Sequence, residues 1–124
     1  MAGLTLDAGA LIAYERGQER IRKILEVSYE RGFVPTISAV ALAEVWRGNA
    51  QDARVARLLR ASSIEILDER IARAAGSLRR ATRGANAIDA CIAVGVRRRG
   101  DAIATSDPGD MRALLGESFT ILTV

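Results

Sequence analysis

The stretch GLTLDAGALI at residues 3–12 decides the fold that we expect for this chain. Its first part is a short apolar run that ends at Asp7, and a helix is expected to start at Ala8. Similar short runs of β-branched or apolar residues recur along the chain, and the stretches between them have helical spacing. This alternation predicts an α/β protein with a mostly parallel sheet. The predicted strands are residues 2–6, 33–36, 62–67, 102–105 and 119–124.

Amphipathic segments predict the helices. Residues 18–31 have a helical face made of Ile21, Ile24, Leu25 and Ser28, with charged residues opposite, and the helix is expected to stop at Gly32. The other clear helical segments are residues 49–61, 68–81 and 86–99. In the segment 68–81 the face expected to be buried consists of Ile71, Ala74, Ala75 and Leu78.

The length and composition exclude several classes of protein. A chain of 124 residues is expected to form one domain, residues 1–124, with a core of ordinary size. Histidine is absent and Cys91 is the only cysteine, which excludes cysteine and histidine zinc sites and catalytic triads with a histidine base. Cys91 lies among apolar residues and is expected to be a buried, inert thiol. No apolar run approaches the roughly 18 residues that suggest a membrane span, and no targeting sequence is recognised, so a soluble cytoplasmic protein is expected.

The basic residues permit a nucleic-acid partner. The net charge is only +3, but Lys23 is the sole lysine and the other seventeen basic residues are arginines, several of which cluster at residues 79–83 and 97–99. Arginine suits phosphate recognition because its planar fork donates two hydrogen bonds at once. The same bias can also reflect genome composition, so it allows such a partner without requiring one.

Four acidic residues, far apart in the sequence, each lie at the edge of a short apolar stretch or within one: Asp7, Glu44, Asp89 and Asp107. Asp7 and Asp107 come after predicted strands, and functional groups of open parallel sheets gather beyond the carboxyl ends of the strands. Acids at positions that a core would give to apolar residues need a compensating partner.

Each acid also has a structural explanation. Asp7, Asp89 and Asp107 are all placed to cap helices, Asp89 through a capping box with Asn86. Glu44 has no such role, because it lies inside a helical stretch on a face that we expect to point inward. The remaining structural explanation for Glu44 is an ion pair with Arg47, three residues away.

A bound divalent cation would explain all four acids together, in place of a separate structural role for each. Two negative charges about 4 Å apart repel by about 4 kcal/mol at an effective dielectric constant near 20, so four acids in one pocket must either take up protons or bind a cation. Oxygen ligands select Mg²⁺ or Mn²⁺, and such a site suits phosphoryl chemistry. Asp110 is a further candidate, more typical of a first-turn helix acid.

The sequence around these acids resembles the PIN-domain nucleases, in particular the VapC-type toxins of bacterial toxin-antitoxin pairs. The motifs that carry the resemblance are LDAGALI at residues 6–12, AEVWRG at 43–48, IDACIA at 88–93 and TSDP at 105–108. The resemblance implies a three-layer α/β/α fold with a central, mostly parallel sheet of strand order 3-2-1-4-5. It also implies a Mg²⁺- or Mn²⁺-dependent endoribonuclease that leaves a 5′-phosphate and a 3′-hydroxyl.

By position, the resemblance assigns Asp7, Glu44, Asp89 and Asp107 as catalytic metal ligands. Asp7 and Asp89 would be the most direct ligands, Glu44 would complete the shell or orient the attacking water, and Asp107 would support a second ion or the water shell. Thr105 and Ser106 would position the phosphate or Asp107. The implied partners are RNA, a VapB-type antitoxin and a second copy of the chain in a homodimer. Residues 18–31 and the helix that carries Trp46 offer surfaces for partners, with a core position as the alternative for Trp46.

Other functions fit less well. The haloacid-dehalogenase pattern needs an aspartate at the position of Gly9, and a receiver domain needs a late lysine, whereas Lys23 is early. No G-x-G-x-x-G motif follows the first predicted strand, which disfavours dinucleotide binding. The remaining alternative is a non-catalytic PIN-like module that binds a protein or RNA.

Overall fold

A computed structural model describes residues 3–124 and contains one five-stranded, fully parallel sheet. The strands are β1 (Leu4–Leu6), β2 (Thr36–Ser38), β3 (Ser63–Glu65), β4 (Ala102–Thr105) and β5 (Ile121–Thr123). Their order in the sheet is β3-β2-β1-β4-β5, with Thr5 of β1 opposite Thr36 on one side and Ile103 on the other. The α/β class and the strand order are confirmed.

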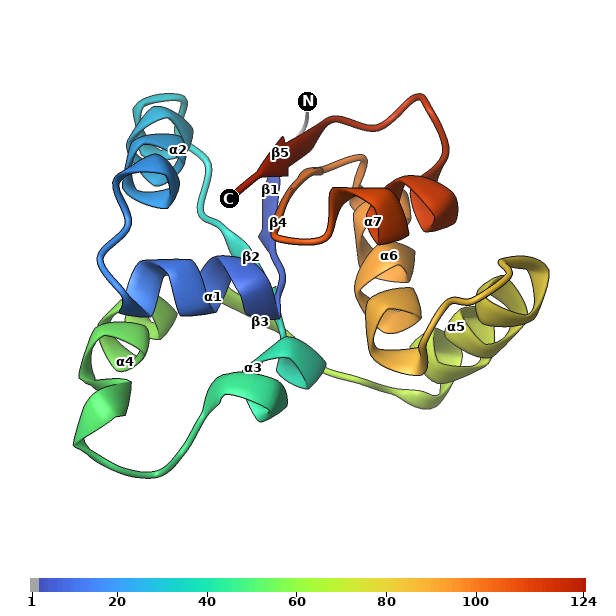
Figure 1. Ribbon diagram of the computed structural model, residues 1–124, viewed down its shortest axis with the longest axis horizontal. Coiled ribbons are helices and arrows are strands. Elements are labelled where there is room, and N and C mark those ends of the chain that lie inside the picture. Colours follow the sequence, from blue (N-terminus) through green and yellow to red (C-terminus); the bar gives the residue numbers. More distant parts are fainter. Residues whose placement is uncertain (1–2) are drawn as a thin grey trace.

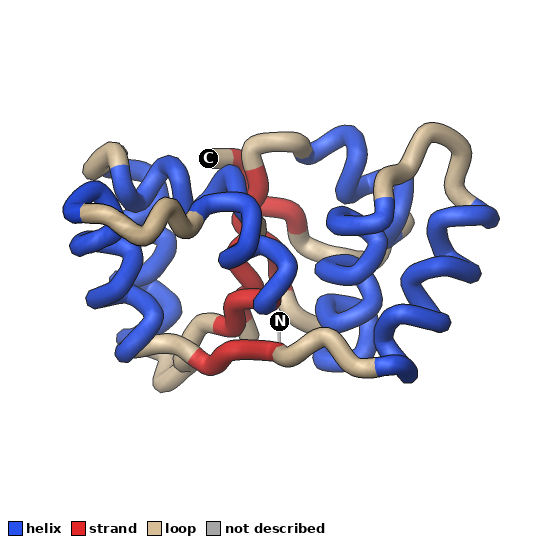
Figure 2. The backbone as a smooth tube through the Cα atoms, turned by 90° about the horizontal axis from the view of Figure 1, so that it is seen from below, coloured by secondary structure: helices blue, strands red, loops and turns tan. Residues whose placement is uncertain are grey.

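Helices cover both faces of the sheet, so the protein has three layers (Figure 1). The helices are α1 (Ala8–Glu15), α2 (Glu19–Glu30), α3 (Ala39–Val45), α4 (Ala53–Arg60), α5 (Glu69–Ala81), α6 (Ala87–Arg99) and α7 (Pro108–Leu115), with a 3₁₀ turn at Ala50–Asp52 before α4. Helices α1, α2 and α4 lie on one side of the strands, and α5, α6 and α7 lie on the other. The view from below in Figure 2 shows the strands between these two helical layers. Helix α3 follows β2 and contacts both α1 and α6.

The predicted helices are found with small changes at their ends. The strands predicted at residues 62–67 and 119–124 are shorter than expected, and two further details differ. The second strand was expected at residues 33–36 but occupies Thr36–Ser38. Pro35 lacks the N–H that a ladder needs, Val34 is 59% exposed, and Ile37 is the residue that packs into the core. In α5, Ala74 is exposed rather than buried, because Ile71 and Ala75 form the inward stripe. Ala2 of the first predicted strand lies outside the described residues.

The core consists mainly of small and aliphatic side chains from the central strands and from α1 and α6. The helix predicted at residues 86–99 is present as α6, but it is not amphipathic as expected, because every residue from Ala90 to Val96 is buried. Cys91 is buried here as predicted, and burial raises the pKa of its thiol. Among residues 3–124 no helix is both long and apolar enough to cross a bilayer.

A polar network joins the central strands to the end of α6. The hydroxyl of Thr5 donates to the carboxylate of Asp101 at 2.8 Å, and Nε of Arg99 donates to the same carboxylate at 2.8 Å. Arg99 also pairs with Glu65 of β3 and donates to the Thr5 hydroxyl. Thr5 and Asp101 are both buried. The network therefore fixes β1 against β4, the two strands that carry Asp7 and Asp107 at their carboxyl ends.

Replacing Asp101 by alanine should lower the free energy of unfolding by about 1–3 kcal/mol, because the buried Thr5 hydroxyl and the Arg99 guanidinium lose their shared acceptor. Urea denaturation followed by circular dichroism measures this change. Glu117→Ala is the control, since Glu117 is highly exposed and lies 3.9 Å from Arg112. A loss for Asp101→Ala no larger than that for Glu117→Ala would show that the network does not stabilise the sheet.

Candidate metal-binding acidic site

All four acids predicted from the sequence line one pocket of about 440 Å³ at the carboxyl edge of the sheet. Asp7 comes from the end of β1, Glu44 from α3, Asp89 from α6 and Asp107 from the turn after β4. Asp110 of α7 also lines the pocket, together with Ala8, Gly9, Ile12, Asn86, Ala87, Ile88 and Ser106. Segments that are distant in the sequence therefore bring five carboxylates to one pocket.

Asp7 is the most enclosed of these acids, at 5% exposure. Its Oδ1 accepts a hydrogen bond of 2.9 Å from the backbone N–H of Ala10, so Asp7 caps α1 as well as lining the pocket. Burial raises the pKa of the Asp7 carboxyl above its usual value, hydrogen bonds with Thr105 and Ala10 lower it, and the charges of Asp89 and Asp107 raise it further. Asp7 therefore caps α1, as one structural explanation expected, but this hydrogen bond does not offset the negative charges of Asp89 and Asp107.

Asp89 is half-buried in the first turn of α6, where Asn86 fixes its orientation. The Asn86 side chain accepts a hydrogen bond from the Asp89 backbone N–H at 2.8 Å and donates one to Asp89 Oδ2 at 2.9 Å. Burial raises the pKa of Asp89, the Asn86 hydrogen bond opposes this, and the charges of Asp110 and Asp107 raise the pKa further. The predicted pairing with Asn86 is present, formed through the amide side chain rather than the Asn86 backbone N–H.

Asp107 is exposed and does not cap α7 through its side chain. Its backbone N–H instead donates to the hydroxyl of Thr105 at 2.9 Å. Thr105 is fully buried at the end of β4, so this bond ties the turn that carries Asp107 to the sheet. The Asp107 carboxylate is therefore held at the pocket and left available, contrary to the capping explanation.

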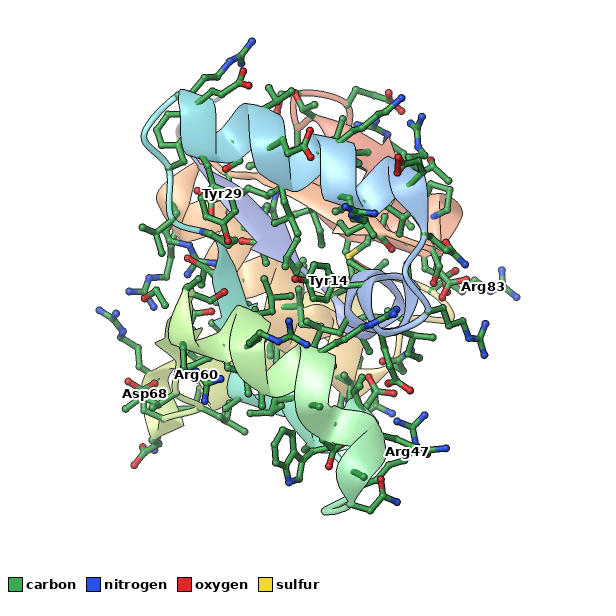
Figure 3. All side chains as sticks on the ribbon, turned by 90° about the vertical axis from the view of Figure 1, so that its left-hand side faces the viewer. Tyr14, Tyr29, Arg47, Arg60, Asp68 and Arg83 are labelled. Carbon is green, nitrogen blue, oxygen red and sulfur yellow. The ribbon has the colours of Figure 1, made fainter. Side chains whose placement is uncertain are left out.

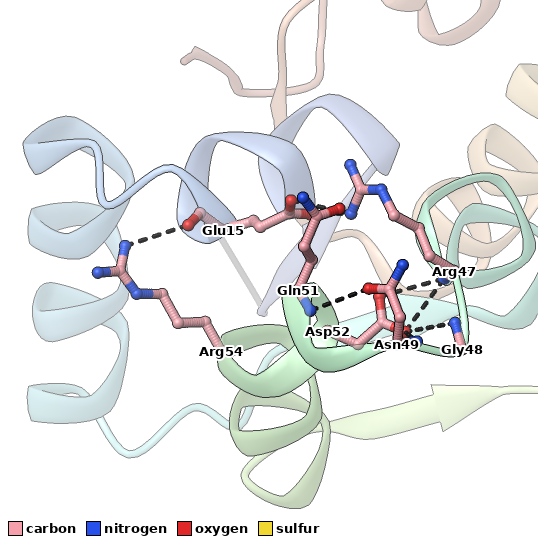
Figure 4. A network of polar contacts seen from close by, with 7 residues as sticks. All are labelled: Glu15, Arg47, Gly48, Asn49, Gln51, Asp52 and Arg54. Carbon is pink, nitrogen blue, oxygen red and sulfur yellow. Dashed lines mark hydrogen bonds and ion pairs between the residues drawn. The ribbon is translucent and has the colours of Figure 1, made fainter.

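Glu44 differs from expectation, because it is exposed and does not point into the core. Helix α3 is only seven residues long and ends at Val45, so Glu44 lies in its last turn at the rim of the pocket. The expected alternative pairing with Arg47 does not occur either. Nη1 of Arg47 contacts the carboxylate of Glu15 at 2.8 Å, which links the end of α3 to α1 (Figure 4).

The loop that follows Glu44 is fixed by Asp52, a buried residue that the sequence analysis did not single out. Its carboxylate accepts hydrogen bonds from the backbone N–H groups of Arg47, Gly48 and Asn49, as Figure 4 shows. Burial opposes ionisation of Asp52, but these three hydrogen bonds lower its pKa below the usual value. The available signal was the capping-box spacing of Asn49 and Asp52.

Basic residues do not neutralise the pocket. Among residues 3–124, no arginine or lysine forms an ion pair within 4.0 Å with Asp7, Glu44, Asp89, Asp107 or Asp110. This arrangement excludes separate guanidinium partners as the explanation for these acids. The pKa values of Asp7 and Asp89 are raised mainly by burial, and the charges of acidic neighbours raise them further.

The donor set of the pocket fits a hard divalent cation, because its polar groups are carboxylate, amide and hydroxyl oxygens. Within the described chain, no three acidic side chains converge closely enough to hold an ion as they stand. Binding would therefore require side-chain rotation, which is available to Glu44 and Asp107 because both are exposed. Asp7 and Asp89 are held by their hydrogen bonds and provide the fixed part of the site.

Gly9 shapes the pocket in a way that the sequence analysis did not recognise. A Cβ atom at this position would lie 2.0 Å from Oγ of Ser106 and 2.7 Å from its Cβ. Only glycine lets α1 approach the turn between β4 and α7 this closely. The contact sets the spacing between the segments that carry Asp7 and Asp107.

Comparisons with known proteins give a consistent result. A model of the family described as PIN domain matches residues 4–114. Comparison with curated proteins gives no match. The fold is similar to that of VapBC2 from Rickettsia felis bound to a promoter DNA fragment, with a TM-score of 0.77, 13% identity and coverage of 98% of both chains. A toxin-antitoxin complex from Klebsiella pneumoniae has a TM-score of 0.75 and 21% identity, covering 96% of this chain and 100% of that one.

A further similar structure is DNA-bound VapBC from Salmonella typhimurium, with a TM-score of 0.72 and 18% identity over 99% of this chain and 98% of that one. At these identities the similarity concerns the fold.

Mn²⁺ should stabilise the protein by about 2.7 kcal/mol at 100 times its dissociation constant, since an ion that binds only the folded state shifts the equilibrium. The effect should be larger at pH 7.5 than at pH 5. The pKa values of Asp7 and Asp89 are raised in the folded protein, so lowering the pH protonates these two carboxylates. Protonated carboxyls bind Mn²⁺ less well, and they no longer repel their acidic neighbours, so the ion has less repulsion to relieve. Thermal unfolding with and without Mn²⁺ at both pH values measures this, and an equal shift in Asp7→Asn would contradict it.

Gly9→Ala should weaken Mn²⁺ binding by about 10- to 100-fold, the usual cost of displacing groups that support a metal site. Calorimetric titration measures the affinity. The double variant Gly9→Ala with Ser106→Gly removes the hydroxymethyl group that the new Cβ would meet, and should recover most of the affinity. Gly76→Ala is a control in α5, where a Cβ meets nothing within 4 Å. Unchanged affinity in Gly9→Ala would show that this close approach is not needed.

Proposed function

This chain belongs to the PIN domain family, and on that premise we propose that it is a Mg²⁺- or Mn²⁺-dependent endoribonuclease, the toxin of a VapBC-type toxin-antitoxin pair, acting on RNA in the cytoplasm. PIN domains are generally nucleases. The choice of RNA as substrate rests on the resemblance to VapC-type toxins in the motifs at residues 6–12, 43–48, 88–93 and 105–108.

The observation that carries the proposal is the convergence of uncompensated acids. Asp7, Glu44, Asp89 and Asp107 come from four different elements and line one pocket, and arginines elsewhere in residues 3–124 pair with other acids instead. A protein without a cation-dependent function gains nothing from this repulsion. When bound, a divalent ion would lower the pKa of a water molecule and offset the negative charge of a phosphodiester.

The roles that we assign follow the environment of each acid. Asp7 and Asp89 are the direct ligands, because their hydrogen bonds hold them at the pocket, and burial together with neighbouring negative charge raises their pKa values. Glu44 is exposed at the rim, so its carboxylate is free to orient the attacking water and accept its proton. Asp107, held through the Thr105 hydroxyl, completes the oxygen donors. Attack on phosphorus then leaves a 5′-phosphate and a 3′-hydroxyl.

The structural neighbours support a protein partner. They include VapBC complexes and a toxin-antitoxin complex, and on that basis we assign this chain an antitoxin of the VapB type. Trp46 is 47% exposed, which rules out the core position considered for it and leaves an aromatic side chain beside Glu44 for partner contact.

We also propose a homodimer. Strand β3 lies at the edge of the sheet, and Ile64, Ile66 and Leu67 are exposed on it and directly after it. Exposed aliphatic side chains grouped on an edge strand support association with a second copy of the chain.

The purified protein should cleave total RNA only when Mg²⁺ or Mn²⁺ is present. The double variant Asp7→Asn with Asp89→Asn should lose more than about 100-fold in kcat/KM, since even outer-shell residues of metal sites cost 10- to 100-fold. Mapping of the cleaved ends should find 5′-phosphates and 3′-hydroxyls.

The matched control is Asp68→Asn, which removes a carboxylate that caps α5 outside the pocket. Equal cleavage by the double variant, or cleavage in EDTA, would contradict the proposal. A wild-type protein that binds RNA or antitoxin but cuts no RNA with either metal would instead favour a non-catalytic PIN-like module.

A further inference from the structure

A smaller hollow adjoins the acidic pocket and shares Asp89 and Asp110 with it. Its other walls are residues 82–85, in the connection between α5 and α6, and Ala113 and Leu114 of α7. Arg83 is the basic residue that lines it, and the residues that line the larger pocket include none. One arginine therefore lines the hollow that adjoins the pocket of five carboxylates.

The backbone around Arg83 is fixed. The N–H of Ala85 donates to the carbonyl of Thr82 at 3.3 Å, and Gly84 takes a left-handed φ of 79° that closes the turn. Nε of Arg79 donates to the carbonyl of Ala85 at 3.4 Å. The next residue, Asn86, caps α6 and holds Asp89. The turn thus places Arg83 at the hollow next to the acidic pocket, in the same segment that orients a proposed metal ligand.

The guanidinium of Arg83 is not used within the fold. Arg47 and Arg99 pair with acids that stabilise the structure. Arg83 is exposed, and in the part of the chain that the structure covers it forms no ion pair with Asp89 or Asp110. Figure 3 shows its side chain at the outer edge of the molecule, extending into solvent. It is therefore available to an incoming ligand.

The charge of the pocket explains what this cation would do. A phosphodiester chain that approaches five carboxylates meets repulsion, and an ion inside the pocket acts mainly on the phosphate next to it. The adjacent phosphates of the same strand need a separate positive group. A guanidinium suits this task because its planar fork donates two parallel hydrogen bonds to phosphate oxygens.

We propose that Arg83 is a substrate-positioning residue that binds a phosphate next to the one being cleaved, on the Asp89 and Asp110 side of the pocket. This inference rests on the proposed nuclease function. The contact recognises the phosphate backbone and not the bases, so it should act on every sequence alike and depend on salt.

Kinetics on a single-stranded RNA with Mn²⁺ test the inference. Arg83→Ala should raise KM about 10-fold, as expected for the loss of one charged phosphate contact, with kcat changed less than about two-fold. Arg83→Lys should recover part of the loss, because lysine keeps the charge without the fork. Arg60→Ala is the matched control: it removes an equal charge from α4, and Arg60 lines neither hollow. Thermal unfolding verifies that each variant is folded.

Binding without cleavage separates this inference from the proposed function. In an Asp7→Asn background with EDTA, fluorescence anisotropy should show that Arg83→Ala weakens RNA binding and reduces the slope of log affinity against log salt by about 1. If the wild-type protein cuts no RNA, the nuclease proposal fails, and this titration still decides whether Arg83 binds phosphate. Unchanged KM and unchanged RNA affinity would overturn the role of Arg83. The role would also be overturned if Arg83→Ala bound Mn²⁺ more tightly than the wild-type protein while binding RNA equally well. In that case Arg83 would only reduce the negative charge of the pocket and would not bind phosphate.

Discussion

Repulsion among carboxylates at the carboxyl edge of the sheet is the constraint on which the rest of the structure depends. Burial raises the pKa values of Asp7 and Asp89, and the charges of acidic neighbours raise them further, so the fold must hold these carboxylates at the pocket against both costs. The buried strands β1 and β4 and the fully packed α6 provide that stability. The Arg99, Asp101 and Thr5 network fixes the two strands that end in acids.

Three arginines of this protein have two different uses. Arg47 and Arg99 act within the fold, where they join α3 to α1 and α6 to the sheet. Arg99 is therefore not available to a nucleic acid as the arginine cluster at residues 97–99 suggested, because it belongs to the polar network with Asp101 and Thr5. Arg83 lies beside the acids without pairing with them. This distribution leaves the pocket without a basic residue in its lining and puts one arginine, Arg83, in the adjoining hollow.

Helix caps and proposed metal ligands coincide at the pocket. Asp7 begins α1, and Asn86 begins α6 and orients Asp89. A cap residue lies where a strand or loop passes into a helix, and in a parallel α/β sheet these passages lie at the carboxyl edge. The same backbone hydrogen bonds therefore serve helix initiation and the placement of the acids, so the structural and functional explanations of Asp7 and Asp89 do not compete.

The sequence by itself determined the class of fold, the strand order through its resemblance to PIN domains, and the identity of the acids, because short apolar runs and carboxylates leave local signals. Local pattern could not determine that Glu44 is exposed, since α3 ends one residue later, nor that Arg47 pairs with Glu15, 32 positions away. Tertiary structure also decides three further features: the hydrogen bonds of Asp52 to the loop after α3, the contact of Gly9 with Ser106, and the position of Arg83 in the hollow shared with Asp89 and Asp110. Each of these depends on how the backbone closes a turn or packs one segment on another, and the hydrophobic period of a single segment carries no information about such long-range distances.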